Sequence, residues 1–124
     1  LNNYGLKTLA KGEENYVEIY EGDGYKRDTS YHQGITWPWL LGLYYNSLKN
    51  MIKNSKNKKQ KVELEEKLEK FRAQIYKTFK NELNDNGCIG SIAELYDSVK
   101  PNLPKGAIAQ GWSVAEVFRI ILGK

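Results

Sequence analysis

The sequence predicts an all-α fold with long loops, because two helical segments stand out by their hydrophobic patterns. In residues 37–53, apolar side chains are too dense for a single stripe, so the first turns should be buried nearly all round. In residues 58–83, apolar side chains recur at steps of three and four and trace one face. A buried helix beside an amphipathic one is the pattern expected of inner and outer helices in a layered α/α barrel.

Length and composition set the outer bounds of this prediction. A chain of 124 residues suits one domain with a modest core, so we treat residues 1–124 as a single domain. No run approaches the about 18 apolar residues of a membrane span, and we expect no membrane partner. The single cysteine, Cys88, excludes an internal disulfide and favours a reducing, cytoplasmic location. The chain begins with Leu1, which favours a piece of a longer protein.

Residues 1–36 are predicted to form a long loop punctuated by glycines, with one short strand possible at residues 16–20. Such a loop is unusual unless it is functional or covers something, so we expect it to be the wall or lid of a site. Within it, Arg27 and Asp28 are expected to form structural pairs rather than to orient a ligand.

Residues 31–42 join this loop to the first helix and hold the only histidine and two of the three tryptophans. Pro38 suits a first-turn position, where its missing N–H would be unsatisfied anyway. Thr36 or Trp37 would then be the N-cap, and Thr36 is the better candidate because its hydroxyl can accept a hydrogen bond. A polar, aromatic loop at the start of a buried helix is where an α-helical enzyme would hold a ligand.

The second helix is predicted from one apolar face, made of Leu64, Leu68, Phe71, Ile75, Phe79 and Leu83. Glu63 with Lys67 and Glu66 with Lys70 add surface pairs in the favourable order. A coiled coil is the structural alternative, but barely three heptads and an imperfect register count against it.

Six lysines lie in residues 49–61, a stretch without an acidic residue. Such a stretch could attract nucleic acid. However, no aromatic side chain interleaves these lysines, as single-strand binding would require. We therefore expect residues 54–57 to be a solvated turn between the two helices, and no nucleic-acid partner.

The last helix is predicted to start at Ser113, which would form a capping box with Glu116 and give that glutamate a structural role. Its expected apolar face is Val114, Val117, Phe118, Ile121 and Leu122. Residues 84–87 should end the preceding helix, since they combine asparagine, aspartate and glycine.

Few residues are candidates for chemistry. No phosphate-binding loop and no metal-ligand spacing is present, so neither a metal site nor a cofactor is expected. Glu94 lies in a segment of glycine and small residues with apolar neighbours, where burial can tune the pKa of a carboxyl group. From the residues alone, a salt-bridged structural role for Glu94 is favoured over a catalytic one.

Three blocks in this sequence resemble the C-terminal, amylo-α-1,6-glucosidase part of glycogen debranching enzymes. They are YHQGITWPWLLG at 31–42, GCIGSIAELYD at 87–97 and KGAIAQGWSVAEVFR at 105–119. The resemblance covers nearly the whole chain and implies the terminal fragment of an (α/α)6 six-hairpin glycosidase barrel. Two features depart from the family pattern: the lysine- and asparagine-rich residues 53–61, and Gly111 where alanine is expected.

The resemblance implies that Glu94 is the general base of an inverting hydrolysis of α-1,6-linked glucose. Inversion uses two carboxyl groups about 6.5–9.5 Å apart, one as acid and one as base. The family's acid is an upstream aspartate with no counterpart in this sequence, so the fragment alone is expected to be inactive. The implied sugar contacts are His32, Gln33, Trp37, Trp39, Gln110 and Trp112.

For some of these residues a structural alternative stays open. Trp37 and Trp112 lie next to predicted helix starts and could be core residues, and Gln110 could serve its own loop. The implied partner is glycogen or another α-glucan, and cut barrel surfaces could let the fragment self-associate. Two alternatives remain for the function: another glucoamylase-like or trehalase-like glycosidase, or a non-catalytic helical module for carbohydrate binding or assembly.

Overall fold

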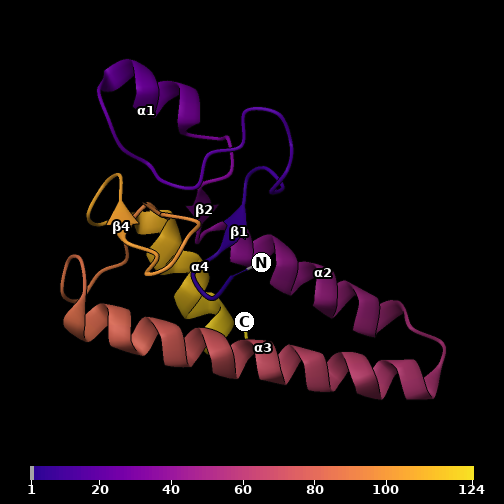
Figure 1. Cartoon of the computed structure of the whole chain (residues 1–124). Coiled ribbons are helices and arrows are strands. Elements are labelled where there is room, and N and C mark those ends of the chain that lie inside the picture. The colour runs from indigo at the N-terminus through magenta and orange to yellow at the C-terminus, as the bar shows by residue number, and fades with distance from the viewer. Residues whose placement is uncertain (1) are drawn as a thin grey trace.

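The computed structural model describes residues 2–124, which form a mostly helical chain with one small sheet (Figure 1). The helices are α1 (Gly24–Ser30), α2 (Leu40–Asn54), α3 (Lys58–Asp85) and α4 (Gly111–Ile121). The strands are β1 (Leu6–Lys7), β2 (Thr36–Trp37), β3 (Leu95–Tyr96) and β4 (Pro104–Lys105). The prediction of a helical fold is confirmed in this coarse form, and the sheet is a feature that it missed.

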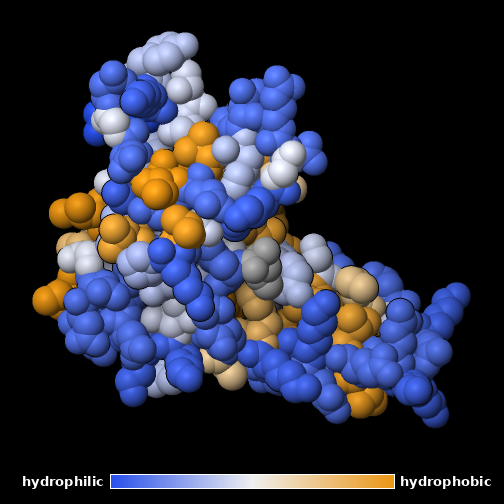
Figure 2. Space-filling model, in the orientation of Figure 1, coloured by the Kyte–Doolittle hydropathy of each residue, from blue (hydrophilic) through white to orange (hydrophobic). Residues whose placement is uncertain are grey.

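Helices α2, α3 and α4 pack against one another and enclose the main core. The predicted amphipathic face of α3 is confirmed: Leu64, Phe71, Ile75 and Phe79 are buried, and its other two members pack against the core. Asn57 caps this helix by accepting hydrogen bonds from two backbone N–H groups of its first turn. The predicted turn between α2 and α3 is therefore present. The end of the α2–α3 pair that carries this turn is largely hydrophilic (Figure 2).

The start of α2 differs from the sequence prediction in two respects. The helix begins at Leu40, and Thr36 does not cap it, because Thr36 belongs to β2. Pro38 lies in the turn just before the helix, where its carbonyl accepts from the Leu41 N–H at 2.9 Å. The first turns are not buried all round either, since Leu43 is 54% exposed.

Helix α4 also begins earlier than predicted, at Gly111, so the expected capping box is wrong. Ser113 lies inside the helix, and its buried hydroxyl has no hydrogen-bond partner among the described residues. Glu116 instead pairs with Arg119, with 2.6 Å between Oε2 and Nη2. The buried face includes Ile120, whereas Phe118 and Leu122, predicted to be on it, are exposed.

The N-terminal part of the chain contains a helix where a loop was predicted. Asp23 caps α1 by accepting from the Lys26 N–H, whereas the glycines around it led to the prediction of a loop. Arg27 and Asp28 lie on this helix. The strand considered at residues 16–20 is wrong, because that segment is irregular and its backbone bonds are isolated ones to residues 13, 33 and 98.

The sheet joins segments that are far apart in the sequence. Its order is β1-β2-β3-β4 and every neighbouring pair is antiparallel. Thr36 pairs with Tyr96, and Tyr96 pairs with Pro104, so residues 31–42, 87–97 and 105–119 converge at one place. None of the helices between residues 2 and 124 has the length and hydrophobicity needed to cross a membrane.

Candidate active site

Glu94 lies just before β3, beside the segment that follows β4. Its backbone N–H donates to the Ala107 carbonyl at 2.9 Å, and the Ala107 N–H donates to the carboxylate oxygen Oε2 at 3.0 Å. The other oxygen, Oε1, accepts from the Tyr31 hydroxyl at 2.5 Å and from the Gln110 amide at 3.4 Å. Three donors from two different segments thus fix the orientation of one half-buried carboxylate.

Gly106 makes this close approach possible. Its φ is +70°, a conformation that side chains rarely adopt, and a Cβ atom at this position would lie 2.4 Å from Oε2 of Glu94. The glycine therefore leaves the space in which the carboxylate reaches the Ala107 N–H.

Tyr31 is itself positioned by Trp37. Its ring packs edge-on against Trp37, with centroids 4.7 Å apart, and its carbonyl accepts from the Trp37 indole N–H at 3.1 Å. Burial raises the pKa of the Tyr31 hydroxyl above its usual value, and the hydrogen bond to Glu94 raises it further. The hydroxyl therefore keeps its proton and remains a donor to the carboxylate.

Aromatic rings continue outward from Tyr31. His32 stacks on Trp37 with centroids 5.3 Å apart and an angle of 12° between the planes. Trp39 stacks on Trp112 at 5.5 Å, and Trp112 also meets Trp37 edge-on. Trp37 is only 2% exposed, while Trp112 is 48% exposed, so the first shapes the cluster and the second offers an open face.

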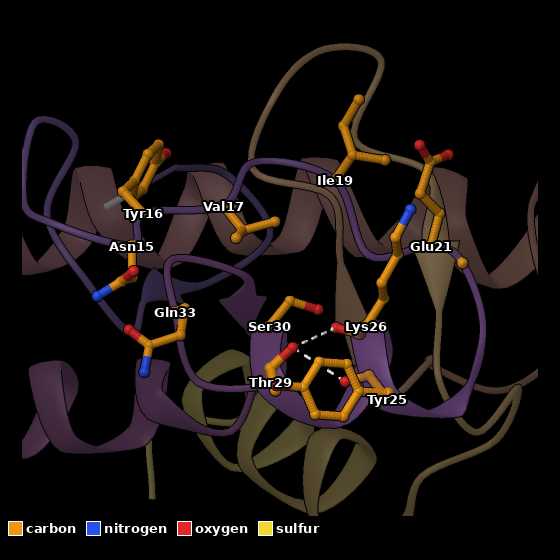
Figure 3. Close-up of a pocket in the computed structure, with 11 residues that line it drawn as sticks. Asn15, Tyr16, Val17, Ile19, Glu21, Tyr25, Lys26, Thr29, Ser30 and Gln33 are labelled. Atoms are coloured by element: carbon orange, nitrogen blue, oxygen red, sulfur yellow. Dashed lines mark hydrogen bonds between the residues drawn. The ribbon is translucent and has the colours of Figure 1, made fainter.

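Four of the six predicted sugar contacts thus form one aromatic cluster: His32, Trp37, Trp39 and Trp112. Gln110 bonds to the Glu94 carboxylate, and Gln33 is the exception. Gln33 lines a separate hollow, between residues 15–22 and α1 (Figure 3). Its backbone carbonyl accepts from the Val17 N–H at 2.6 Å, which ties it to that loop.

Tyr31 and the Ala107 N–H are the site groups that the sequence prediction missed. Tyr31 opens the block 31–42, but nothing in its spacing connects it with a glutamate 63 residues away. A backbone N–H carries no residue-type signal at all. Only the pairing of the segments around β3 and β4 reveals these two donors.

The arrangement can orient a carboxylate at the edge of an open aromatic surface. Oε2 accepts one hydrogen bond and can accept a second, for example from a water molecule. Within residues 2–124, no group of three or more His, Cys, Asp or Glu side chains is placed to hold a metal ion.

A sequence model of the family described as amylo-alpha-1,6-glucosidase matches residues 1–119. This range includes Glu94, the three donors to its carboxylate and the whole aromatic cluster. No curated protein and no solved structure matches the chain.

Proposed function

The chain belongs to the amylo-alpha-1,6-glucosidase family, as a C-terminal region of a glycogen debranching enzyme, and on this premise we propose that Glu94 is its general base. In the proposed reaction, Glu94 removes a proton from a water molecule as the water oxygen bonds to the anomeric carbon. The bond from that carbon to the α-1,6 oxygen breaks, and a second carboxyl group protonates the departing oxygen. Glucose leaves with its anomeric centre inverted.

One observation carries this proposal: the Tyr31 hydroxyl donates to Glu94 next to the tryptophan cluster. A general base must be oriented before the water arrives, because a misplaced base loses much of its effect. Tyr31, Gln110 and the Ala107 N–H supply that orientation, and Oε2 retains acceptor capacity for the water.

The substrate contacts follow from the same cluster. The exposed face of Trp112 and the partly buried Trp39 would cover the apolar face of a glucose ring. His32, exposed and stacked on Trp37, would donate to or accept from its hydroxyl groups. We propose glycogen or a related α-glucan as the partner, and the cytoplasmic location stays a prediction.

We further propose that the general acid comes from another part of a longer chain, so that residues 1–124 alone are inactive. The resemblance to this family implies that the acid is an aspartate in an upstream block, and residues 1–124 contain no counterpart of that block. In an (α/α)6 barrel, further helices would cover apolar side chains such as Leu43 and Met51, which are 54% and 50% exposed. Uncovered, the same surfaces favour self-association.

The test uses the full-length protein and the substitution Glu94→Gln, which preserves size and one acceptor oxygen. Glucose release from a branched limit dextrin should fall by roughly 10³-fold or more, while dextrin binding and the unfolding transition stay close to those of the wild type. Glu116→Gln is a matched control, because Glu116 pairs with Arg119 on α4 and should leave the rate within about twofold.

A Glu94→Gln variant that releases glucose at a near-normal rate would overturn the proposal. If that variant also bound dextrin normally, the segment would be a carbohydrate-binding module in which Glu94 is structural.

A further inference from the structure

A concave site lies near the aromatic cluster, between residues 15–22 and α1. It is an open hollow of about 710 Å³, within the range of small-molecule binding sites. Figure 3 shows the amides of Asn15 and Gln33 at one end and the carboxylate of Glu21 at the other. The ring of Tyr25 lies along the α1 side.

The walls of this hollow are tied to the rest of the fold. On the loop side, the Val17 N–H donates to the Gln33 carbonyl, and Ser98 donates its N–H to the Glu18 carbonyl at 2.7 Å. The Tyr20 N–H donates to the buried carboxylate of Asp97 at 2.8 Å. A site whose walls are fixed in advance loses little conformational entropy when a ligand binds.

The lining selects for a neutral, polar ligand. Its two charged side chains, Glu21 and Lys26, are of opposite sign, and the Lys26 amino group extends toward Glu21 (Figure 3). The two amides can each donate and accept, which suits hydroxyl groups that also do both. Tyr25 is 79% exposed, so its ring face is available for stacking. The amides at one end of the hollow and the exposed ring toward the other offer partners for the polar edges and the apolar faces of pyranose units in a glucan.

We propose that this hollow binds a second stretch of the α-glucan, separate from the glucose unit that is cleaved. The proposal rests on the function proposed above and adds a subsite to it. The two sites share one short segment: Ser30 lines the hollow, Tyr31 contacts Glu94, and Gln33 lines the hollow again. A branched polysaccharide can therefore occupy both sites, whereas a small substrate reaches only the site at Glu94.

The experiment measures glucose release by the full-length protein from two substrates. One is a branched limit dextrin, and the other is a short oligosaccharide with a single α-1,6-linked glucose. Tyr25→Ala should raise the KM for the limit dextrin about tenfold, leave its kcat unchanged, and leave the KM for the short substrate unchanged. Tyr25→Phe keeps the ring and should restore the wild-type KM.

Tyr76→Ala is the matched control, since Tyr76 is a half-exposed tyrosine on α3, outside the hollow. An unchanged KM for limit dextrin in Tyr25→Ala would overturn the subsite and leave the role of Glu94 intact. An equal rise of KM for both substrates would also overturn it, because Tyr25 would then act on the cleavage site itself. Failure of the proposed function would appear separately, as an active Glu94→Gln variant.

Discussion

Among residues 2–124, the hydrogen bonds Tyr31–Glu94 and Tyr96–Glu82 join the same two kinds of side chain, but their surroundings differ completely. Tyr31 donates to Glu94 at 2.5 Å beside an open aromatic surface. Tyr96 donates to Glu82 at 2.8 Å inside the helical core. Glu82 is 2% exposed and also accepts from the Asn86 amide, whereas Glu94 is only half buried.

The comparison shows that a tyrosine–glutamate hydrogen bond can have a structural or a catalytic role, depending on whether substrate can reach the carboxylate. The Glu82 carboxylate has no route to a substrate, so its bond to Tyr96 satisfies buried polar groups that would otherwise cost stability. Oε1 of Glu94 accepts two hydrogen bonds, but the hydrogen bond to its other oxygen, Oε2, is exposed at the surface. Accessibility, rather than the presence of a buried acid, separates the candidate catalytic pair from the structural one.

The largest expected difference between the two pairs comes from the glycine next to each carboxylate. A Cβ on Gly106 would lie 2.4 Å from Oε2 of Glu94, but a Cβ on Gly87 would lie 3.5 Å from Oε1 of Glu82. Because a carboxylate end can swing away, Gly106→Ala should displace the base rather than unfold the chain. A displacement of about 1 Å can cost roughly 10²-fold in rate, which is the loss we expect in glucose release by the full-length protein.

Gly87→Ala is the control for this experiment, since Gly87 also has a positive φ, of +54°, and the backbone strain is therefore comparable. Its rate of glucose release should stay within about threefold of the wild type. Equal losses in the two variants would show that strain, and not the position of Glu94, governs the rate.

Removing each tyrosine hydroxyl should have a smaller effect, on the rate at Glu94 and on stability at Glu82. Tyr31→Phe takes one donor from Glu94 and should lower kcat about tenfold with little change in stability. Tyr96→Phe leaves the buried Glu82 short of a donor and should lower the free energy of unfolding by about 2 kcal/mol. Glucose release and urea unfolding, measured on both variants, distinguish these outcomes. A loss of stability without a loss of kcat in Tyr31→Phe would make both pairs structural.

The helices could be predicted from the sequence to the extent that their signals are local. The predicted start of α3 at residue 58 is confirmed, and its end differs by two residues, because its apolar face repeats with the helical period along one continuous stretch. The two-residue strands carry no such signal. Thr36 was interpreted as a helix cap because its partners in the sheet, at positions 7 and 96, cannot be read from its neighbours.

The candidate site was predicted in its residue types but not in its geometry. Four of the six expected sugar contacts lie in the aromatic cluster, Gln110 bonds to Glu94, and Gln33 instead lines the adjacent hollow. His32 and Gln33 are sequence neighbours that meet different surroundings, a distinction that depends on the turn after α1. Tyr31 was missed as a donor since its partner comes from a segment 63 residues away.

The smallest expected effect is a dependence of stability on alkaline pH. Burial raises the pKa of Tyr96 far above its usual value, and the Glu82 carboxylate raises it further. Below the ordinary tyrosine pKa of about 10, the folded and the unfolded chain both keep this proton. Above that pH the unfolded chain loses the proton while the folded chain retains it, so the free energy of unfolding must fall as pH rises. The slope contributed by this one group approaches about 1.4 kcal/mol per pH unit.

Urea unfolding of the 124-residue chain between pH 8 and pH 11 would measure this slope. Because Tyr96→Phe lacks the titrating group, its stability should fall less steeply above pH 10, and the difference from the wild type should shrink there. The folded chain also keeps the Tyr31 proton over this range, because burial raises that pKa too, so Tyr31→Phe should flatten the curve above pH 10 by a similar amount. Parallel curves for the wild type and Tyr96→Phe would mean that the buried pair does not hold its proton as its surroundings require, and the contrast between the two pairs would then rest on accessibility alone.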